Sequence, residues 1–237
     1  MIRDNLTQIF DTVIQTAINC GRNPQEIKLV AVSKGMGVDQ IGQAIDCGQT
    51  LFGENYLQEA SEKIRHFSQK INWHFIGHLQ SNKARLAAEL FDVVETVDSL
   101  KVAQALDKHA KSLNKDLSIL VQVNTGKEKQ KSGVLPEETE QLLRQIAQTT
   151  DLRILGLMTI PPYFSDPEKS RPYFKALKNL ADRLSAQQLF MDNNQIELSM
   201  GMSGDYQVAI EEGATIIRVG TALFGNRIPH ALDQQGA

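Results

Sequence analysis

The stretch "IKLVAVSKG", residues 27–35, is a run of mostly apolar residues that ends abruptly in Lys34. Its apolar residues are continuous, not alternating, which is typical of a strand in a parallel sheet covered on both faces. Seven more runs of this kind follow along the chain. They lie at residues 50–54, 73–77, 92–97, 118–124, 153–159, 195–200 and 215–220. With the first at 27–33, the sequence predicts eight strands.

Longer segments with helical periodicity separate these runs. Pro136 and the pair Asp166-Pro167 are typical residues for the start of a helix. Gly213 follows "YQVAIEE", where a left-handed helix cap is expected. Apolar residues also recur at helical intervals over residues 2–17. This predicts an amphipathic helix ahead of the first strand, not a signal peptide.

Strict alternation of strands and helices predicts parallel strands joined by right-handed crossovers. An open doubly wound sheet would also satisfy the pattern, but eight strands in 237 residues favour a closed (β/α)8 barrel, the TIM barrel fold. No linker or low-complexity tract interrupts the alternation. We therefore expect one domain over residues 1–230, with an extra N-terminal helix and a short tail at 231–237.

Composition limits the partners and the compartment. The net charge of −3 comes from acids and bases scattered along the chain, which indicates neither a nucleic-acid nor a membrane partner. No apolar run is as long as a membrane span. Two cysteines, Cys20 and Cys47, are too few for a disulfide framework and suit a reducing compartment. We expect a cytoplasmic protein, and the lack of an additional apolar helix stripe favours a monomer.

In such a barrel, residues at the carboxyl ends of the strands, or directly after them, face the active-site mouth. Those residues are strongly polar here. They include Lys34, Glu54, Asn55, His78, Asn124, Thr159, Ser199, Arg218, Gly220 and Thr221. The list predicts a polar site at this end of the barrel.

Two of these loops have the composition of a phosphate site. "SMGMSGD" (199–205) offers two hydroxyls and two glycines after the seventh strand, and "GT" (220–221) follows the eighth. Barrel enzymes frequently bind phosphate with these two loops, where glycines let the anion approach the backbone. Alternatively, Ser199 and Ser203 only cap a helix and the glycines only turn the chain. The coincidence of both loops favours phosphate.

Lys34 at the mouth would have a lowered pKa if desolvated, and could then form a Schiff base with a carbonyl. The alternative is a lysine that reaches solvent past the rim. With a phosphate site, the ligand is a phosphorylated aldehyde or ketone, either pyridoxal phosphate or a sugar phosphate. Arg218 is the only charge in its strand. It forms either a structural ion pair, for example with Glu197 or Glu54, or a hydrogen bond to a ring nitrogen, which a pyridine would supply and a sugar would not.

The remaining candidates have simpler interpretations. We interpret His74, within "WHFIGH" (73–78), as a hydrogen-bonded structural residue, and assign neither it, His78 nor Glu54 a catalytic role. The charged segment "NTGKEKQKSGV" (124–134) is predicted to form a solvated lid over the mouth.

Several motifs, in order along nearly the whole chain, resemble one known family. They are "VAVSK" (30–34), "FGENY" with "QE" (52–59), "WHFIGHLQSNK" (73–83), "GLMTIPP" (156–162), "LSMGMSGD" (198–205) and "RVG" with "LFG" and Arg227 (218–227). Together they are similar to the signatures of the pyridoxal phosphate homeostasis proteins, the YggS/PROSC group.

The resemblance implies a fold-type III barrel related to the N-terminal domain of alanine racemase, which holds pyridoxal 5'-phosphate (PLP) as a Schiff base on Lys34. It implies that Arg218 faces the pyridine nitrogen and that Asn55 lies beside the ring. The phosphate would be held by Ser199, Ser203, Gly220 and Thr221. The family is not credited with an established catalytic activity or a metal. It is thought to buffer PLP or deliver it to PLP-dependent apo-enzymes, with influence on vitamin B6 and amino-acid balance.

One departure from the family pattern follows Lys34. Members often carry a proline in the segment that here reads Gly35-Met36-Gly37, so we expect a looser loop.

Physical chemistry also argues against full catalysis. A racemase needs acid/base groups on both faces of the cofactor, and related enzymes take the second group from outside the barrel, in a domain we do not expect here. An arginine at the pyridine nitrogen also weakens the cofactor as an electron sink. The alternatives are a small PLP-dependent amino-acid racemase with Lys34 and either His78 or Tyr163 as bases, and a Schiff-base sugar-phosphate aldolase.

Overall fold

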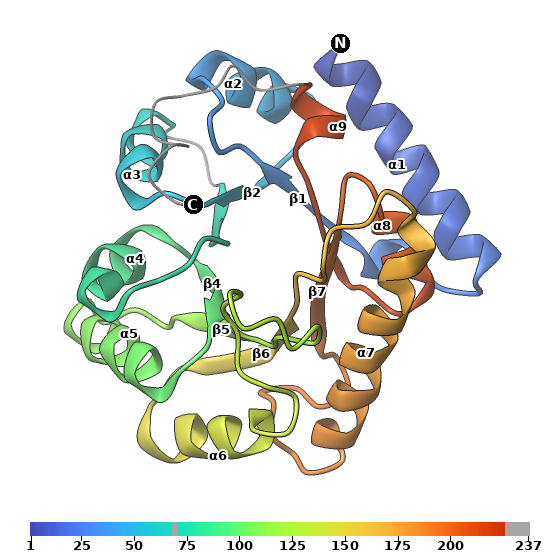
Figure 1. The fold of residues 1–237 in the computed structure, drawn as a ribbon. Coiled ribbons are helices and arrows are strands. Elements are labelled where there is room, and N and C mark those ends of the chain that lie inside the picture. Colours follow the sequence, from blue (N-terminus) through green and yellow to red (C-terminus); the bar gives the residue numbers. More distant parts are fainter. Residues whose placement is uncertain (68–70, 226–237) are drawn as a thin grey trace.

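A computed structural model describes residues 1–67 and 71–225; the predicted tail at 231–237, and with it the predicted domain boundary, lies outside the described residues. The eight predicted strands are present and pair in parallel, in sequence order, to close a barrel (Figure 1). They are β1 (Lys28–Val32), β2 (Leu51–Glu54), β3 (Asn72–Phe75), β4 (Val93–Val97), β5 (Ser118–Gln122), β6 (Arg153–Met158), β7 (Glu197–Met202) and β8 (Ile216–Val219). The predicted (β/α)8 TIM barrel is confirmed.

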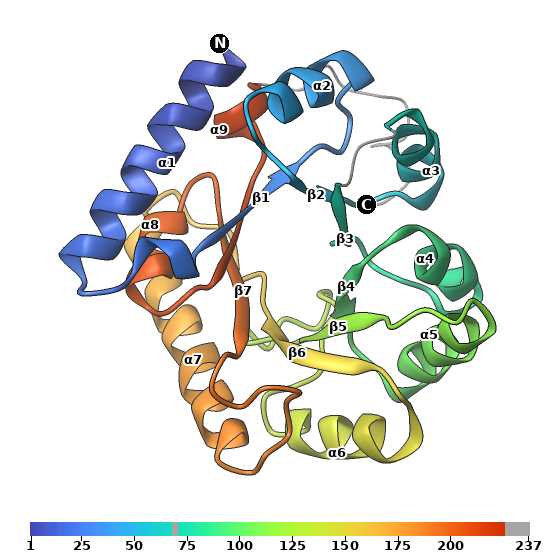
Figure 2. The same cartoon turned by 180° about the vertical axis from the view of Figure 1, so that it is seen from behind.

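Helices surround the barrel on all sides, as the two views along its axis show (Figures 1 and 2). They are α1 (Ile2–Asn19), α2 (Val38–Asp46), α3 (Leu57–His66), α4 (Ala84–Leu90), α5 (Leu100–Ser112), α6 (Thr139–Thr149), α7 (Arg171–Ser185), α8 (Tyr206–Glu211) and α9 (Thr221–Phe224). Short 3-10 turns lie at Pro24–Glu26, Ser81–Lys83 and Pro167–Ser170. None of the helices within these described ranges is long and apolar enough to cross a membrane.

The predicted N-terminal helix is α1. Its buried residues include Ile2, Leu6, Ile9, Val13 and Ala17, which recur every three or four positions and so share one face of the helix. That face packs against α2, α8 and α9 on the outside of the barrel (Figure 1). The extra helix therefore covers the seam where the last and first strands meet.

Two helix starts differ from the prediction by a few residues. The side chain of Asp166 accepts a hydrogen bond from the Glu168 amide and begins a 3-10 turn, so α7 starts only at Arg171. After Pro136 the chain makes a turn before α6 begins at Thr139. The left-handed cap at Gly213 is confirmed, with a φ of +99°.

The end of β7 is irregular, and this irregularity matters for the site. The pairing register of β7 with β8 shifts at a bulge that lies between Ser199 and Met202. The strand ends at Met202, two residues past the predicted end. Gly201 lies in this bulge with a φ of +90°, and a Cβ there would come within 2.5 Å of the Ala209 Cβ. The bulge changes the direction of the chain between Ser199 and Ser203.

The barrel interior is packed, not hollow. Successive residues of a strand face opposite sides, so alternate residues point inward. The inward-facing apolar cluster consists of Val30, Val32, Ile76, Val93, Leu120, Met158 and Ile216. At the same alternation, β3, β4 and β8 place His74, Glu95 and Arg218 inside, and all three are buried. Polar residues in this interior need partners, because each unpaired buried polar group is costly.

Candidate functional site

A cavity of about 470 Å³ opens at the carboxyl ends of the strands. It is lined by six of the seven residues predicted to bind a cofactor. These are Lys34, Asn55, Ser203, Arg218, Gly220 and Thr221. The predicted convergence of loops from β1, β2, β7 and β8 on one site is therefore observed.

Lys34 lies in the turn that follows β1. The Met36 amide donates to the Ser33 carbonyl at 3.0 Å, and Gly35 adopts a φ of +73°, which favours glycine. The Gly35 amide donates to Glu59 Oε1 at 2.6 Å, and the Met36 side chain is buried. These contacts hold the turn at several points and do not support the looser loop expected from Gly35-Met36-Gly37.

A buried ion-pair cluster lies beneath this turn. Lys63 Nζ donates to the Ser33 carbonyl at 2.6 Å, to Glu54 Oε1 at 2.7 Å and to Glu59 Oε1 at 2.6 Å. Glu54 is fully buried and also accepts a hydrogen bond from Ser33 Oγ at 2.6 Å. Burial raises the pKa of Glu54, although Lys63 and Ser33 oppose the rise. Glu54 therefore supports the turn that carries Lys34 and is not a free group at the mouth.

Ser203 marks an oxygen-binding position between the last two loops. Its Oγ accepts hydrogen bonds from the backbone amides of Gly220 at 3.2 Å and Ala222 at 3.3 Å. The N-cap of α8 is Asp205, so neither Ser199 nor Ser203 caps that helix; Ser203 instead accepts from an amide in the first turn of α9. The Ser203 hydroxyl and the two amides that donate to it gather three hydrogen-bond donors at one position, a set that fits a phosphate oxygen.

Arg218 is buried and reaches the cavity from inside the barrel. Its Nη1 donates to Ser199 Oγ at 2.6 Å and its Nη2 to the Thr159 carbonyl at 2.9 Å. The ion pairs considered with Glu197 or Glu54 are wrong, since Glu197 pairs with Lys28 and Glu54 with Lys63. Burial lowers the pKa of Arg218, and the charges of Glu95 and Asp205 oppose this effect.

Ser199 is the predicted site residue that does not line the cavity. It is fully buried, and its Oγ donates to Glu95 Oε2 at 2.5 Å while accepting from Arg218. Because the hydroxyl is engaged on both sides inside the barrel, this geometry does not support its predicted role in holding a phosphate.

Asn55 has an unsatisfied polar atom. Its Oδ1 is buried, without a hydrogen-bond partner among residues 1–67 and 71–225, and the residue lines the cavity. An unpaired buried acceptor costs about 1–3 kcal/mol, which a ligand or a water molecule that donates a hydrogen bond would recover. Asn55 therefore fits its predicted place beside a bound ring.

The apolar walls of the cavity, which the sequence did not identify, include Val32, Ile76, Ile160 and Met202. Tyr163, considered above as a base, lines the cavity together with Phe164 after β6. Phe164 was not predicted, although the two prolines in "TIPPYF" (159–164) could have placed it in a loop at the mouth. The Tyr163 side chain is largely exposed.

His74 has its predicted role, and the charged loop 124–134 lies near the carboxyl ends of the strands without lining the cavity. His74 Nδ1 lies 2.6 Å from Glu95 Oε1, which confirms it as a hydrogen-bonded buried residue. His78 Nδ1 lies 3.0 Å from Ser132 Oγ, and Lys131 Nζ donates to the Pro161 carbonyl at 2.9 Å. The loop 124–134 thus contacts segments that follow β3 and β6 at the mouth. In the described part of the chain, no group of three or more His, Cys, Asp or Glu residues could hold a metal ion.

Comparison with known families agrees with this geometry. The model of the alanine racemase N-terminal domain matches residues 18–228. The pyridoxal phosphate homeostasis protein of Vibrio alginolyticus is 45% identical over 231 residues, which cover 95% of this chain and 97% of that protein. The protein of the same name from Escherichia coli K12 is 42% identical over 234 residues, again 95% and 97% of the two chains.

Solved structures give the same result. The structure of PipY from Synechococcus elongatus with PLP bound has a TM-score of 0.80 and 35% identity, and covers 95% of this chain and 100% of PipY. An alanine racemase of Clostridium difficile, at 18% identity and a TM-score of 0.72, shares the fold over 57% of its own chain. The chain belongs to the family of the pyridoxal phosphate homeostasis proteins, whose barrel is that of the alanine racemase N-terminal domain.

Proposed function

We propose that this protein binds pyridoxal 5'-phosphate on Lys34 and serves in PLP homeostasis as a carrier without catalytic turnover. The observation that carries the proposal is the single cavity that brings together a lysine amine, a guanidinium and an oxygen site with two amide donors. PLP has an aldehyde, a pyridine nitrogen and a phosphate, and each matches one of these groups. PipY, whose whole chain is covered by 95% of this one, is described with PLP bound.

Each residue has a distinct task in this arrangement. Lys34 would hold the cofactor covalently, since its amine can condense with an aldehyde and release one water molecule. Ser203, Gly220 and Thr221 would hold the phosphate through hydroxyl and amide donors. Arg218 would donate to the pyridine nitrogen and keep it unprotonated, and Asn55 would lie beside the ring. When bound, the cofactor would supply an electron-withdrawing ring, which an unprotonated nitrogen weakens.

A small racemase is the alternative, and the geometry around the cavity favours it less. Such an enzyme needs a second, fixed acid/base group opposite Lys34. Tyr163 is 88% exposed, and the His78 side chain is 57% exposed with Nδ1 bound to Ser132. Neither is held in the cavity by neighbouring side chains.

Isotope exchange separates the two functions. The PLP-loaded protein is incubated with single enantiomers of amino acids in deuterated water, and α-proton exchange is followed by nuclear magnetic resonance. A carrier leaves the α-protons in place. Exchange that is lost in Lys34→Ala would establish catalysis and overturn the carrier proposal.

The wider setting is also part of the proposal. We place the protein in the cytoplasm as a monomer that passes PLP to PLP-dependent apo-enzymes. Cys20 and Cys47 are both free thiols, which supports a reducing compartment. Incubation of the loaded protein with an apo-enzyme tests delivery: we expect reactivation faster than free PLP gives at the same total concentration, and equal rates would contradict delivery. Light scattering tests the oligomeric state against the mass of one chain.

A further inference from the structure

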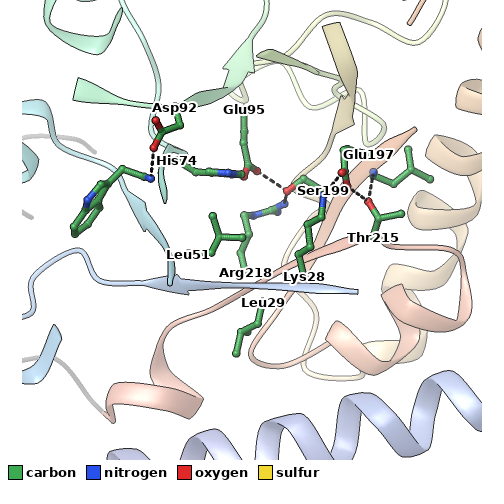
Figure 3. Close-up of polar contacts among 12 residues, drawn as sticks. Lys28, Leu29, Leu51, His74, Asp92, Glu95, Glu197, Ser199, Thr215 and Arg218 are labelled. Carbon is green, nitrogen blue, oxygen red and sulfur yellow. Dashed lines mark hydrogen bonds and ion pairs between the residues drawn. The ribbon is translucent and has the colours of Figure 1, made fainter. Parts of the chain in front are cut away.

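A chain of hydrogen bonds crosses the inside of the barrel and ends at Arg218 (Figure 3). His74 on β3 contacts Glu95 on β4, Glu95 contacts Ser199 on β7, and Ser199 contacts Arg218 on β8. The three links measure 2.6, 2.5 and 2.6 Å. The four residues are each less than a tenth exposed.

The donors in this chain all point toward Glu95. Arg218 has only N–H donors, so Ser199 Oγ must accept from it, and the single hydroxyl proton of Ser199 is then directed to Glu95 Oε2. On the other side, His74 Nδ1 lies 2.6 Å from Glu95 Oε1, and because an ionised carboxylate can only accept, His74 donates from Nδ1. The carboxylate of Glu95 therefore fixes the orientation of Ser199, and through it that of Arg218.

Electrostatics supports an ionised Glu95. Complete burial alone would raise the pKa of Glu95, but the hydrogen bonds from His74 and Ser199 and the charge of Arg218 outweigh it, so the pKa lies below its usual value. A buried guanidinium without a counter-charge would be strongly destabilising. Glu95 is the carboxylate that Arg218 reaches through one hydroxyl, so the two charges compensate each other.

His74 holds Glu95 from the opposite end of the barrel. Its ring lines a second cavity of about 370 Å³ at the amino ends of the strands. The charged groups that share this cavity with it are Lys28 on β1, Asp92 before β4, Asp116 before β5 and Glu197 on β7. The hydrogen-bond chain thus runs from one mouth of the barrel to the other.

We propose that Glu95, held by His74, is a positioning residue for the cofactor: it supplies the counter-charge of Arg218 and fixes its guanidinium against the ring nitrogen. This inference rests on the proposed binding of PLP. In this inference, Ser199 bridges Glu95 and Arg218 inside the barrel and does not bind the phosphate. The effect of Glu95 on the cofactor passes through Arg218, because Glu95 does not line the cavity.

The test compares Glu95→Gln with Glu197→Gln, the same substitution at a carboxylate that contacts Lys28 and Thr215 but not the chain to Arg218. Wild type and variants are loaded with PLP, and the absorbance of the bound chromophore is titrated with pH. Removal of the Glu95 charge takes away one of the two carboxylates, Glu95 and Asp205, whose charges compensate the positive charge of Arg218. This disfavours the protonated chromophore, so its midpoint moves to lower pH by roughly half a unit or more.

In Glu197→Gln we expect the same midpoint as in wild type. In Glu95→Asp, which restores the charge, we expect a midpoint close to that of wild type. A midpoint in Glu95→Gln equal to that of wild type would overturn the inference while leaving the proposed function intact. A wild-type protein that does not bind PLP would overturn both.

Ser199→Ala provides a second test of the inference, which is needed if Glu95→Gln does not fold. This variant retains both charges and removes only the bridge between them. Arg218 then loses one of its two hydrogen bonds, and we expect the dissociation constant for PLP to rise roughly tenfold. Unchanged affinity in a folded Ser199→Ala protein would equally overturn the inference.

Discussion

The two mouths of the barrel are both polar, but they differ in how their polar groups are paired. At the amino ends of the strands, Glu197 forms an ion pair with Lys28 and accepts from Thr215 Oγ1, and Asp92 accepts from the Trp73 amide (Figure 3). At the carboxyl ends, Asn55 Oδ1 has no partner in the described ranges, and the two amide bonds to Ser203 are long, at 3.2 and 3.3 Å.

This difference separates stabilising residues from binding residues. Paired polar groups at the amino-end mouth have completed their hydrogen bonds within the chain, so their substitution should alter the stability of the barrel. Groups at the carboxyl-end mouth keep hydrogen-bonding capacity for a ligand, as in other barrels of this type. Substitutions at the two mouths should therefore separate effects on ligand binding from effects on stability.

Lys34→Ala should abolish covalent attachment of PLP, because Lys34 carries the only amine among the described residues that line the cavity. The visible absorbance of the loaded protein should disappear, while thermal unfolding stays close to that of wild type, since Lys34 is only partly buried. Lys34→Arg is the matched control: it keeps the positive charge but cannot condense with an aldehyde. A coloured Lys34→Arg protein would contradict the assignment.

Lys63→Met should lower the free energy of unfolding by about 3–5 kcal/mol, because it leaves the buried carboxylate of Glu54 without its cation. Urea denaturation measures the change. The control is Lys178→Met, which removes an exposed pair with Asp182 and should cost less than about 0.5 kcal/mol. Equal losses in both variants would show that the cluster beneath the Lys34 turn contributes nothing beyond a surface ion pair.

Substitution of Ser203 and of Ser199 should change the affinity for PLP and for pyridoxal in different ways. Ser203→Ala should weaken PLP binding roughly tenfold but leave the binding of pyridoxal, which has no phosphate, unchanged. Ser199→Ala should weaken both ligands to the same extent, because its effect passes through Arg218 and the ring nitrogen. Fluorescence titration gives the four constants. A Ser199→Ala protein that loses affinity only for PLP would restore its predicted role as a phosphate ligand.

Acid should destabilise the wild type more than Glu95→Gln. The pKa of Glu95 is lowered in the folded state, so its contribution to stability is present above the unfolded value of about 4.5 and is lost as the pH falls through the folded value. The difference in slope between the two proteins can reach about 1.4 kcal/mol per pH unit. Urea denaturation at a series of pH values below 4.5 measures it, and parallel curves would show that Glu95 is not ionised.

Lys28→Met at the amino-end mouth should have the smallest effect. The Lys28 side chain is 53% exposed, so loss of its pair with Glu197 should cost less than about 1 kcal/mol after allowance for solvent screening. PLP affinity should not change. A clear loss of PLP affinity in Lys28→Met would show that residues at the amino-end mouth also contribute to binding.

The fold could be predicted almost completely from the sequence, because burial of both faces of each strand leaves a continuous apolar run that is visible by itself. Most of the site could be predicted as well, since position at the end of a barrel strand identifies Lys34, Asn55 and Arg218. The two serines could not be distinguished. Their difference comes from the bulge at Gly201, and a register shift between β7 and β8 leaves no mark in the pattern of residue types.

Glu95 was missed for a different reason. It lies within "VVETV" (93–97), and as the only charge in that run it carries the same signal as Arg218 in its own strand. Each is a single charged residue at an inward position, and each required a partner inside the barrel. The sequence does not show that these two charges meet, because Ser199 bridges them and their strands are on opposite sides of the interior.

Borohydride reduction of the PLP-loaded protein, followed by peptide mass mapping, identifies the residue to which the cofactor is attached. Reduction makes the bond between the cofactor and an amine permanent, so the modified residue can be identified. We expect a yellow protein that loses its visible absorbance on reduction and then carries one adduct, on Lys34. A protein that stays colourless with added PLP, or an adduct only on another lysine, would contradict the binding of PLP on Lys34.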